Sequence, residues 1–227
     1  MSELLEKIAY CVEFGKINQQ SPYPPDMKGQ VGADELTKEA LDSGVGAEDI
    51  LKKGLVIGME RIGIKFRENK VFVPQVLMSA KAMSTAMEHL KPFFQSGDVK
   101  RSGIFIIGTV AGDLHDIGKN LVSMMVEGNG WEVVDLGTDV SAEKFVDAVK
   151  NNPGGHIGLS ALLTTTMPYM KRVIDEFQDD DDLKDIKMTV GGAPISDIYA
   201  EEIGADGYAE DAISAVDIAF RLMDAPA

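Results

Sequence analysis

The chain has little cysteine, few basic residues and no long apolar run, and each shortage excludes a class of protein. Its 227 residues include one cysteine, Cys11, so no disulfide can form within the chain. Because Cys11 lies among apolar neighbours such as Ile8 and Val12, we expect a buried, unreactive thiol. With 22 Lys and Arg against 37 Asp and Glu, the formal net charge of -15 argues against a nucleic-acid partner, because phosphate binding requires a basic surface.

The apolar runs are also too short for a membrane protein. None approaches the roughly 20 residues that a membrane-spanning helix needs. Residues 1–8 are amphipathic and acidic, which is not the pattern of a secretory signal sequence. We therefore expect a cytoplasmic protein without a membrane partner.

The N-terminal part of the chain has the apolar periodicity of helices. The predicted helices cover residues 2–14, 34–41, 48–66 and 74–92. Pro92 is expected to end the last of them, because proline lacks the N–H that continues a helix. The proline-rich segment Asn18–Gly32 predicts a long loop, whose part Ser21–Gln30 is either a mobile surface excursion or a functional flap. Together the pattern predicts an antiparallel four-helix bundle over residues 1–95.

The pattern changes after the polar segment 95–103 to alternating strands and helices. Strands are predicted near residues 104–110, 132–136, 157–160, 187–190 and 206–208. Helices are predicted near residues 117–129, 142–151, 167–177, 198–203 and 211–223. Residues 96–227 therefore predict an α/β domain of the flavodoxin-like or Rossmann-like type, with a five-stranded parallel sheet in the order 2-1-3-4-5.

This strand order brings together loops of unusual composition. The loop after the first strand contains Asp113 and His115. The loop after the third strand begins at Ser160 and is rich in hydroxyl groups, and the fourth strand runs into Gly191-Gly192. Open α/β sheets bind ligands at the carboxyl ends of their strands, where the strand order reverses. We therefore expect a ligand site between the first and third strands.

Asp113 and His115 by themselves leave two interpretations open. A carboxylate that accepts one ring N–H of a histidine makes the other nitrogen a better metal ligand. Alternatively, Asp113 or Asp116 caps the helix that begins near Ile117, and two residues alone favour the cap.

Other kinds of site find less support. A zinc site is short of ligands, because His89 and His156 have no ligand-like spacing to His115. His89 is expected on the polar face of a helix, and His156 in a loop before the third strand. No nucleophile elbow surrounds Ser160, and the glycines do not have the spacing of a phosphate loop.

Three separated motifs nevertheless form a recognisable set. They read Gly112-Asp113-Leu114-His115-Asp116-Ile117-Gly118, Ser160-Ala161-Leu162 and Gly191-Gly192. In this order they resemble the cobalamin-binding signature Asp-X-His-X-X-Gly, Ser-X-Leu, Gly-Gly. The segment from Gly58-Met59-Glu60 to Pro74-Gln75 resembles the helical cap that accompanies this signature in methionine synthase and in the corrinoid proteins of methyltransferase systems. The resemblance covers nearly the whole chain.

The resemblance implies roles for individual residues. His115 would be the lower axial ligand of cobalt and Asp113 its hydrogen-bond partner, while Thr166 stands where methionine synthase has a serine that completes this network. Phe66 and Val73 would cover the upper face of the corrin, although methionine synthase has a leucine at the second position. The other implied contacts to the cofactor are Gly112, Leu114, Asp116, Ile117, Gly118, Ser160, Leu162, Thr164, Gly191 and Gly192.

The implied function is that of a carrier without catalysis of its own. The cofactor would be cobalamin, which would accept a methyl group as cob(I)alamin from a substrate-specific methyltransferase. As methylcobalamin it would give this group to a second methyltransferase that uses tetrahydrofolate or a thiol. A corrinoid-reactivating protein would be a further partner.

The methyl donor stays open among aryl methyl ethers, methanol, methylamines and betaines. A free-standing carrier is favoured over methionine synthase, because 227 residues leave no room for homocysteine, folate and activation domains.

Three alternatives remain at this point. A cobalamin-binding subunit of an adenosylcobalamin mutase would not usually carry the helical cap. A cobalamin sensor would need a DNA-binding or signalling module, for which the acidic N-terminal half offers no candidate. A receiver-like or nucleotide-binding flavodoxin fold would bind no cobalamin at all.

Overall fold

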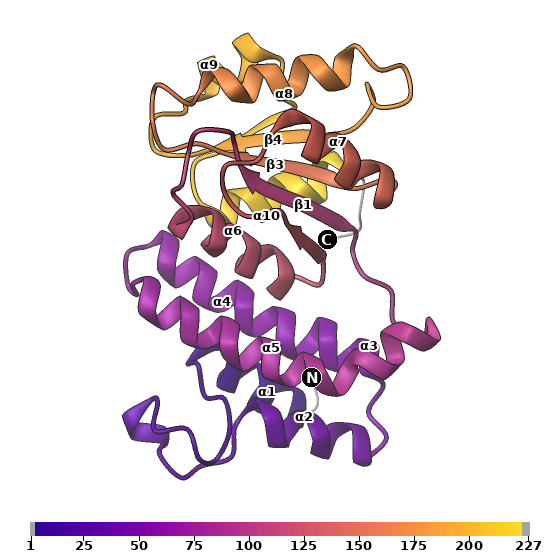
Figure 1. The fold of residues 1–227 in the computed structure, drawn as a ribbon. Helices are drawn as coiled ribbons and strands as arrows, with labels where there is room; N and C mark the ends of the chain where they lie inside the picture. The colour runs from indigo at the N-terminus through magenta and orange to yellow at the C-terminus, as the bar shows by residue number, and fades with distance from the viewer. Residues whose placement is uncertain (1–2, 224–227) are drawn as a thin grey trace. The chain divides into compact units, whose positions relative to one another are not determined.

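The structure, a computed structural model, describes residues 3–223, which fall into two compact units. One unit contains residues 1–101 together with 128–130, and the other contains residues 102–127 and 131–227. The regular elements within residues 3–101 are all helical, whereas the second unit is built on a parallel sheet (Figure 1). No helix within residues 3–223 is long and apolar enough to cross a membrane.

The helical unit is assembled around the first helix of the chain. Its helices are α1 (Glu3–Glu13), α2 (Ala33–Asp42), α3 (Ala47–Ile50), α4 (Val56–Arg67) and α5 (Val73–Ser96). A π-helical turn, η2 (Leu51–Leu55), joins α3 to α4, so the helix predicted at 48–66 forms as one interrupted run. Helix α1 packs against α2, η2, α4 and α5. Cys11 is buried as expected, and burial raises the pKa of its thiol to about 11.

The prediction that Pro92 ends the last helix of this unit is wrong. Helix α5 continues through Pro92 to Ser96 and ends at Gly97, whose φ of 82° lies in the left-handed region that favours glycine. Pro92 and Glu88 are both exposed. The Glu88 carbonyl that loses its helical partner can therefore bind water, which lowers the cost of a proline inside the helix.

The segment from Asn18 to Gly32 is a loop, as predicted, with one short 3₁₀ turn, η1 (Pro25–Met27). Its two ends are tied together, because the amide of Ala33 donates to the carbonyl of Lys16 at 3.0 Å. The ammonium of Lys16 is fully buried and donates to the carbonyl of Ser21 at 2.9 Å. The loop is therefore an ordered excursion with closed ends.

The second unit has the predicted strand order, β2-β1-β3-β4-β5, with all neighbours parallel. The strands are β1 (Ile104–Thr109), β2 (Glu132–Asp135), β3 (His156–Ser160), β4 (Met188–Gly191) and β5 (Gly207–Ala209). In register, Thr109 pairs with Ser160 and Ser160 pairs with Gly191. The loops that follow β1, β3 and β4 therefore leave the sheet at the same level.

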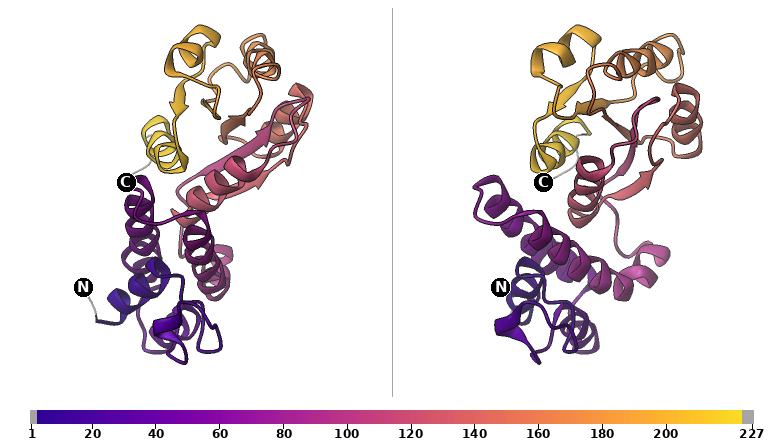
Figure 2. Two further views of the ribbon diagram at one scale, coloured as in Figure 1. Left: turned by 90° about the vertical axis from the view of Figure 1, so that its left-hand side faces the viewer. Right: turned by 60° about the vertical axis from the view of Figure 1, so that its left-hand side comes forward.

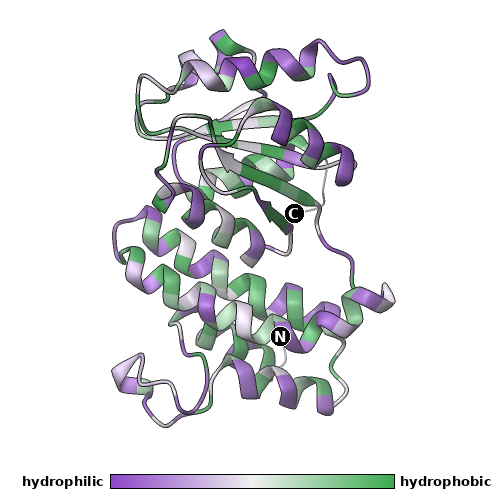
Figure 3. Cartoon of the chain, viewed as in Figure 1, coloured by the Kyte–Doolittle hydropathy of each residue, from purple (hydrophilic) through white to green (hydrophobic). Residues whose placement is uncertain are grey.

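Helices cover both faces of this sheet (Figures 1 and 2). They are α6 (Ile117–Gly128), α7 (Ala142–Asn151), α8 (Pro168–Gln178), α9 (Asp197–Ile203) and α10 (Ala212–Leu222). Helices α7, α8 and α9 share one face, while α6 and α10 lie on the other. The central strand β1 is hydrophobic along most of its length, and the helices carry hydrophobic and hydrophilic residues on different sides, as expected for a sheet buried on both faces (Figure 3).

His156 is not a loop residue, and that prediction is wrong. It is the first residue of β3, fully buried, and its ring stacks on Phe105 with 5.1 Å between the ring centroids. Its Nε2 lies 2.8 Å from the hydroxyl of Thr189, and its Nδ1 has no hydrogen-bond partner within residues 3–223. Burial lowers the pKa of His156 to about 4, so the ring is neutral at neutral pH.

Candidate functional site

The candidate site begins with the loop between β1 and α6, which is held from several sides. The hydroxyl of Thr109, at the end of β1, donates to the carbonyl of His115 at 2.8 Å. The amide of Gly112 donates to the carboxylate of Asp139 at 2.8 Å, and the amide of Asp139 donates to the carbonyl of Asp113 at 3.0 Å. The loop backbone is thus fixed by residues outside the loop itself.

Asp113 is the centre of the site, because its fully buried carboxylate accepts hydrogen bonds on both oxygens. Oδ1 accepts from the backbone amide of His115 at 3.1 Å and lies 2.7 Å from His115 Nδ1. Oδ2 accepts from the amides of Leu162 at 2.8 Å and Leu163 at 3.3 Å, and from the hydroxyl of Thr166 at 2.7 Å. Asp113 therefore joins the loop after β1 to the loop after β3.

These contacts set the charge of Asp113. Burial by itself would raise its pKa, but the hydrogen bonds from Leu162, Thr166 and His115 outweigh burial and hold the pKa well below its usual value. The carboxylate is therefore ionised and can only accept hydrogen bonds. The proton between the two side chains must then reside on His115 Nδ1.

His115 consequently has its other ring nitrogen available. With Nδ1 protonated and donating to Asp113, Nε2 carries the lone pair of the neutral imidazole. Half of the His115 side chain is exposed, and its Nε2 forms no hydrogen bond within the part of the chain that the structure describes. An oriented, accessible imidazole nitrogen of this kind is a ready metal ligand.

Large apolar side chains are exposed in the two loops that meet at Asp113. Leu114 and Ile117, on either side of His115 in the chain, are 74% and 75% exposed. Leu162 and Leu163, whose amides bind Asp113, are each 42% exposed. An exposed group of large apolar side chains beside a polar centre is typical of a binding surface.

The glycines of the motifs differ in what a side chain would meet. At Gly118, near the start of α6, an added Cβ would meet no atom within 4 Å. At Gly192, whose φ is 138°, an added Cβ would come within 1.9 Å of the carbonyl oxygen of Ala161. At Gly191 it would come within 2.9 Å of the carbonyl oxygen of Ala209. The pair after β4 thus allows neighbouring backbones to approach, whereas Gly118 leaves open space beside the helix.

The remaining predicted residues lie in two places. Asp116 is exposed and accepts from the side-chain amide of Asn120 at 3.1 Å, so it stabilises the first turn of α6. Ser160 ends β3, and Thr164 is exposed in the loop that follows. Phe66 and Val73 belong to the helical unit, where they are partly buried near the end of α4 and at the start of α5.

The comparisons with known proteins identify the kind of protein to which this site belongs. Residues 103–217 match the family described as "B12 binding domain", and residues 30–91 match a second family with the same description. The chain is 43% identical over 196 residues to monomethylamine corrinoid protein 1 of Methanosarcina barkeri, covering 85% of this chain and 90% of that one. This chain belongs to the B12-binding corrinoid protein family.

Two further members are similar along most of their length. Dimethylamine corrinoid protein 1 of Methanosarcina acetivorans is 41% identical over 194 residues, which cover 85% of this corrinoid protein and 89% of the relative. In the crystal structure of a methanol:cobalamin methyltransferase complex from Methanosarcina barkeri, one chain aligns with a TM-score of 0.80 and 31% identity, covering 98% of this chain and 80% of that one.

Family membership implies cobalamin as the cofactor, and the carboxyl edge of the sheet fits it. The oriented imidazole of His115 would be a suitable nitrogen ligand for the cobalt of this cofactor. The exposed leucines 114 and 162 provide apolar surface for a large flat ring. The open space at Gly118 leaves room for a further part of the ligand.

Some residues of the site could not be recognised from the sequence. Asp139, Thr109 and Asp135 fix the loop around His115, yet none belongs to the motifs that the corrinoid family shares. Their positions at or after the ends of β1 and β2 were the available signal, because the predicted strand order already placed these strands side by side. Which of the polar side chains there contact the loop depends on distances that the sequence does not give.

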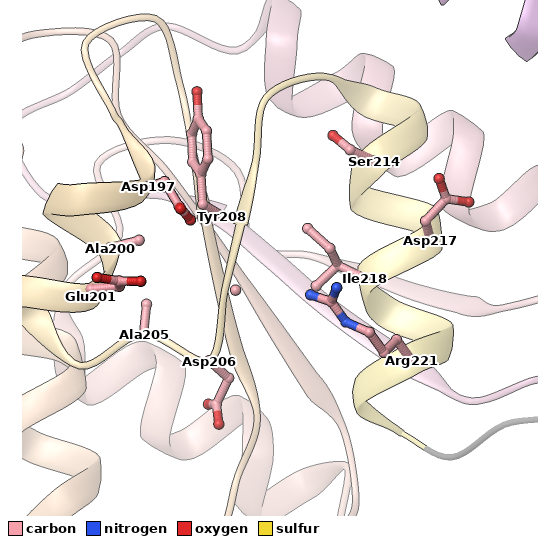
Figure 4. Close-up of a pocket in the computed structure, with 11 residues that line it drawn as sticks. Asp197, Ala200, Glu201, Ala205, Asp206, Tyr208, Ser214, Asp217, Ile218 and Arg221 are labelled. Atoms are coloured by element: carbon pink, nitrogen blue, oxygen red, sulfur yellow. The ribbon is translucent and has the colours of Figure 1, made fainter.

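A hollow elsewhere in the same unit is not part of the predicted site. It has a volume of about 460 Å³ and lies along the edge strand β5, between α9 and α10 (Figure 4). Asp197, Glu201, Tyr208 and Arg221 line it, together with smaller side chains. None of its lining residues belongs to the cobalamin motifs.

Proposed function

We propose that this corrinoid protein is a methyl carrier that shuttles between two methyltransferases. The proposal rests above all on His115, whose Nε2 is free and accessible while a buried carboxylate holds the other side of the ring. The similar proteins named for methylamines and for a methanol:cobalamin methyltransferase complex support the same role.

When bound, cobalamin supplies a cobalt centre that can accept and release a methyl group. In this proposal His115 Nε2 would hold the cobalt. Asp113 keeps Nδ1 protonated and the ring oriented, and Thr166 holds the carboxylate by a 2.7 Å hydrogen bond.

The other cofactor contacts are proposed from the motifs and from their surroundings. Gly118 would leave space for the nucleotide tail of cobalamin, and Ser160, Leu162 and Thr164 would contact the cofactor's own base, which His115 would replace at the cobalt. Gly112, Leu114, Asp116 and Ile117 belong to the same contact surface. Gly191 and Gly192 lie along the tail. Phe66 and Val73 are proposed to shield the upper face of the corrin.

The proposed partners follow from a carrier role. A substrate-specific methyltransferase loads the methyl group, a second one removes it to tetrahydrofolate or a thiol, and a reactivating protein restores the reduced cofactor. Because the curated relatives are named for monomethylamine and dimethylamine, these two compounds come first among donors to be tested, followed by methanol.

The axial ligand can be tested by electron paramagnetic resonance of the cobalt(II) form. Protein labelled with ¹⁵N-histidine is loaded with hydroxocobalamin and reduced. If a labelled histidine binds cobalt, the nitrogen splitting has the ¹⁵N pattern. If the unlabelled base of the cofactor binds instead, the splitting has the ¹⁴N pattern. The ¹⁵N pattern is expected in wild type and should be absent in H115A. The control is H89A, because the ring nitrogen of His89 lies 2.6 Å from Asp34 and outside the site, and this variant should keep the ¹⁵N pattern. A ¹⁴N pattern in labelled wild type would refute the assignment.

Carrier function is tested separately with the loaded protein. Methylation of the reduced protein is followed by its absorption spectrum in the presence of methyltransferases specific for monomethylamine, dimethylamine or methanol. Methylation by at least one of them, followed by demethylation with a second methyltransferase, is the expected result. Tight cobalamin binding without methyl transfer from any donor would favour a mutase subunit or a sensor.

A further inference from the structure

The His115 loop has a second anchor, which starts at an ion pair between a buried lysine and an exposed carboxylate. Lys119, on the first turn of α6, is only 3% exposed. Its ammonium lies 2.6 Å and 2.5 Å from the two carboxylate oxygens of Asp135, at the end of β2. The pair ties the start of α6 to the strand beside β1.

One chain of hydrogen bonds runs from this pair to the residue after His115. The ammonium of Lys119 also donates to the side-chain carbonyl of Asn120 at 2.7 Å. The side-chain amide of Asn120 in turn donates to the carboxylate of Asp116 at 3.1 Å, and its backbone amide donates to the Asp116 carbonyl at 2.7 Å.

A second chain of hydrogen bonds runs from the same carboxylate to His115 itself. Oδ1 of Asp135 accepts from the amide of Gly137 at 2.8 Å. The carbonyl of Gly137 accepts from the amide of Thr109 at 3.0 Å, and the hydroxyl of Thr109 donates to the His115 carbonyl at 2.8 Å. Asp135 is therefore linked to the loop at two points, Asp116 and the carbonyl of His115.

We propose that Lys119 is a positioning residue that holds the His115 imidazole in place for cobalt, acting through Asp135 and Asn120. The inference rests on the proposed function, because it assigns Lys119 to the same axial ligand. A buried ammonium is costly unless it is paired and hydrogen-bonded, and here it has three acceptor atoms on two side chains. This full set of acceptors fixes the helix start, and hence the direction in which the loop leaves β1.

The two anchors of the loop hold different parts of it. Asp113 and Thr166 fix the imidazole ring through its Nδ1, from the side of β3. Lys119 and Asp135 fix the backbone of the loop, from the side of β2. Loss of the second anchor should leave the ring paired with Asp113 while the loop as a whole gains freedom.

The test compares K119M with the matched control K144M. Methionine keeps most of the aliphatic stem of Lys119 but removes its donors. Lys144 is an exposed residue on α7 of the same unit. Both variants are labelled with ¹⁵N-histidine, loaded with hydroxocobalamin and reduced to cobalt(II). Paramagnetic resonance gives the fraction with a histidine ligand, and equilibrium titration gives the dissociation constant of cobalamin.

In K119M we expect a mixture of ligated and unligated cobalt(II), and a dissociation constant about 10-fold higher than in wild type, as is usual when a partner behind a metal ligand is removed. K144M should match wild type in both. A fully ligated spectrum in K119M would overturn the proposal even if the variant is less stable. If K119M does not fold, the double variant N120A/D135A removes the side chains that carry both chains of hydrogen bonds, and a wild-type spectrum there overturns the proposal.

The outcome for wild type separates this inference from the proposed function. If labelled wild type lacks the ¹⁵N pattern, the assignment of His115 fails. If wild type has the ¹⁵N pattern and K119M is fully ligated as well, only the role of Lys119 fails.

Discussion

Replacement of Thr166 tests how much the buried network around Asp113 contributes to the fold. T166V removes the hydroxyl that donates to Asp113 Oδ2 at 2.7 Å but keeps the size of the side chain. Thr166 is 5% exposed and Asp113 is fully buried, so solvent screens this bond little. A hydrogen bond to a charged group contributes about 1.5–3 kcal/mol, and we expect T166V to lower the free energy of unfolding by that amount.

T166S is the matched control, because it keeps the hydroxyl and loses one methyl group. The methyl loss should cost about 1 kcal/mol, so T166V should be the less stable of the two. Because the folded-state pKa of Asp113 is lowered, the stabilisation is complete above the unfolded pKa of about 3.9 and declines as pH falls below it. The unfolded-state pKa is common to wild type and T166V, so the gap between them stays constant until pH falls through their folded-state pKa values, which lie below about 3.9.

The assay is urea unfolding of the cofactor-free protein, followed by tryptophan fluorescence. The single tryptophan, Trp131, is fully buried in the sheet unit beside Phe105 and Phe220, so its emission follows this unit. Equal stability of T166V and T166S at pH 7 would refute the reasoning. It would mean that the hydroxyl of Thr166 does not stabilise an ionised Asp113.

Three other substitutions test separate features of the structure. His156 has its pKa lowered to about 4 from 6.5 by burial, so its contribution to stability is complete above pH 6.5 and is lost as pH falls toward 4. Between pH 7.5 and pH 5, wild type should lose roughly 2 kcal/mol more than H156Q in urea unfolding, and parallel losses would contradict the burial argument. G118L places a side chain in open space, so cofactor-free stability should be unchanged or higher while cobalamin binding weakens at least roughly 10-fold; unchanged binding would show that no ligand occupies this space. G192A forces a Cβ against the carbonyl of Ala161 at a φ of 138° and should lower the free energy of unfolding by about 3 kcal/mol or more, whereas a melting temperature equal to that of wild type would be inconsistent with this contact.

Much of the fold could be predicted because its signals are local. Short apolar runs alternating with amphipathic segments indicated all five strands, and parallel strands that are each followed by a helix have few allowed arrangements. The errors came where surroundings override local propensity. Pro92 lies inside α5 because the carbonyl it deprives of a partner is exposed, and His156 is buried because it pairs in register with Phe105.

The sequence by itself determined the order of the elements, the edge of the sheet that carries the ligand loops, and the motif that contains Asp113 and His115. These depend on residue type and on spacing along the chain. The tertiary structure alone decided that Asp139 accepts from the amide of Gly112, that Gly192 touches Ala161, and that Lys119 pairs with Asp135. Such contacts join residues that are distant in sequence, and their existence depends on distances of a few ångströms that only the packed chain sets.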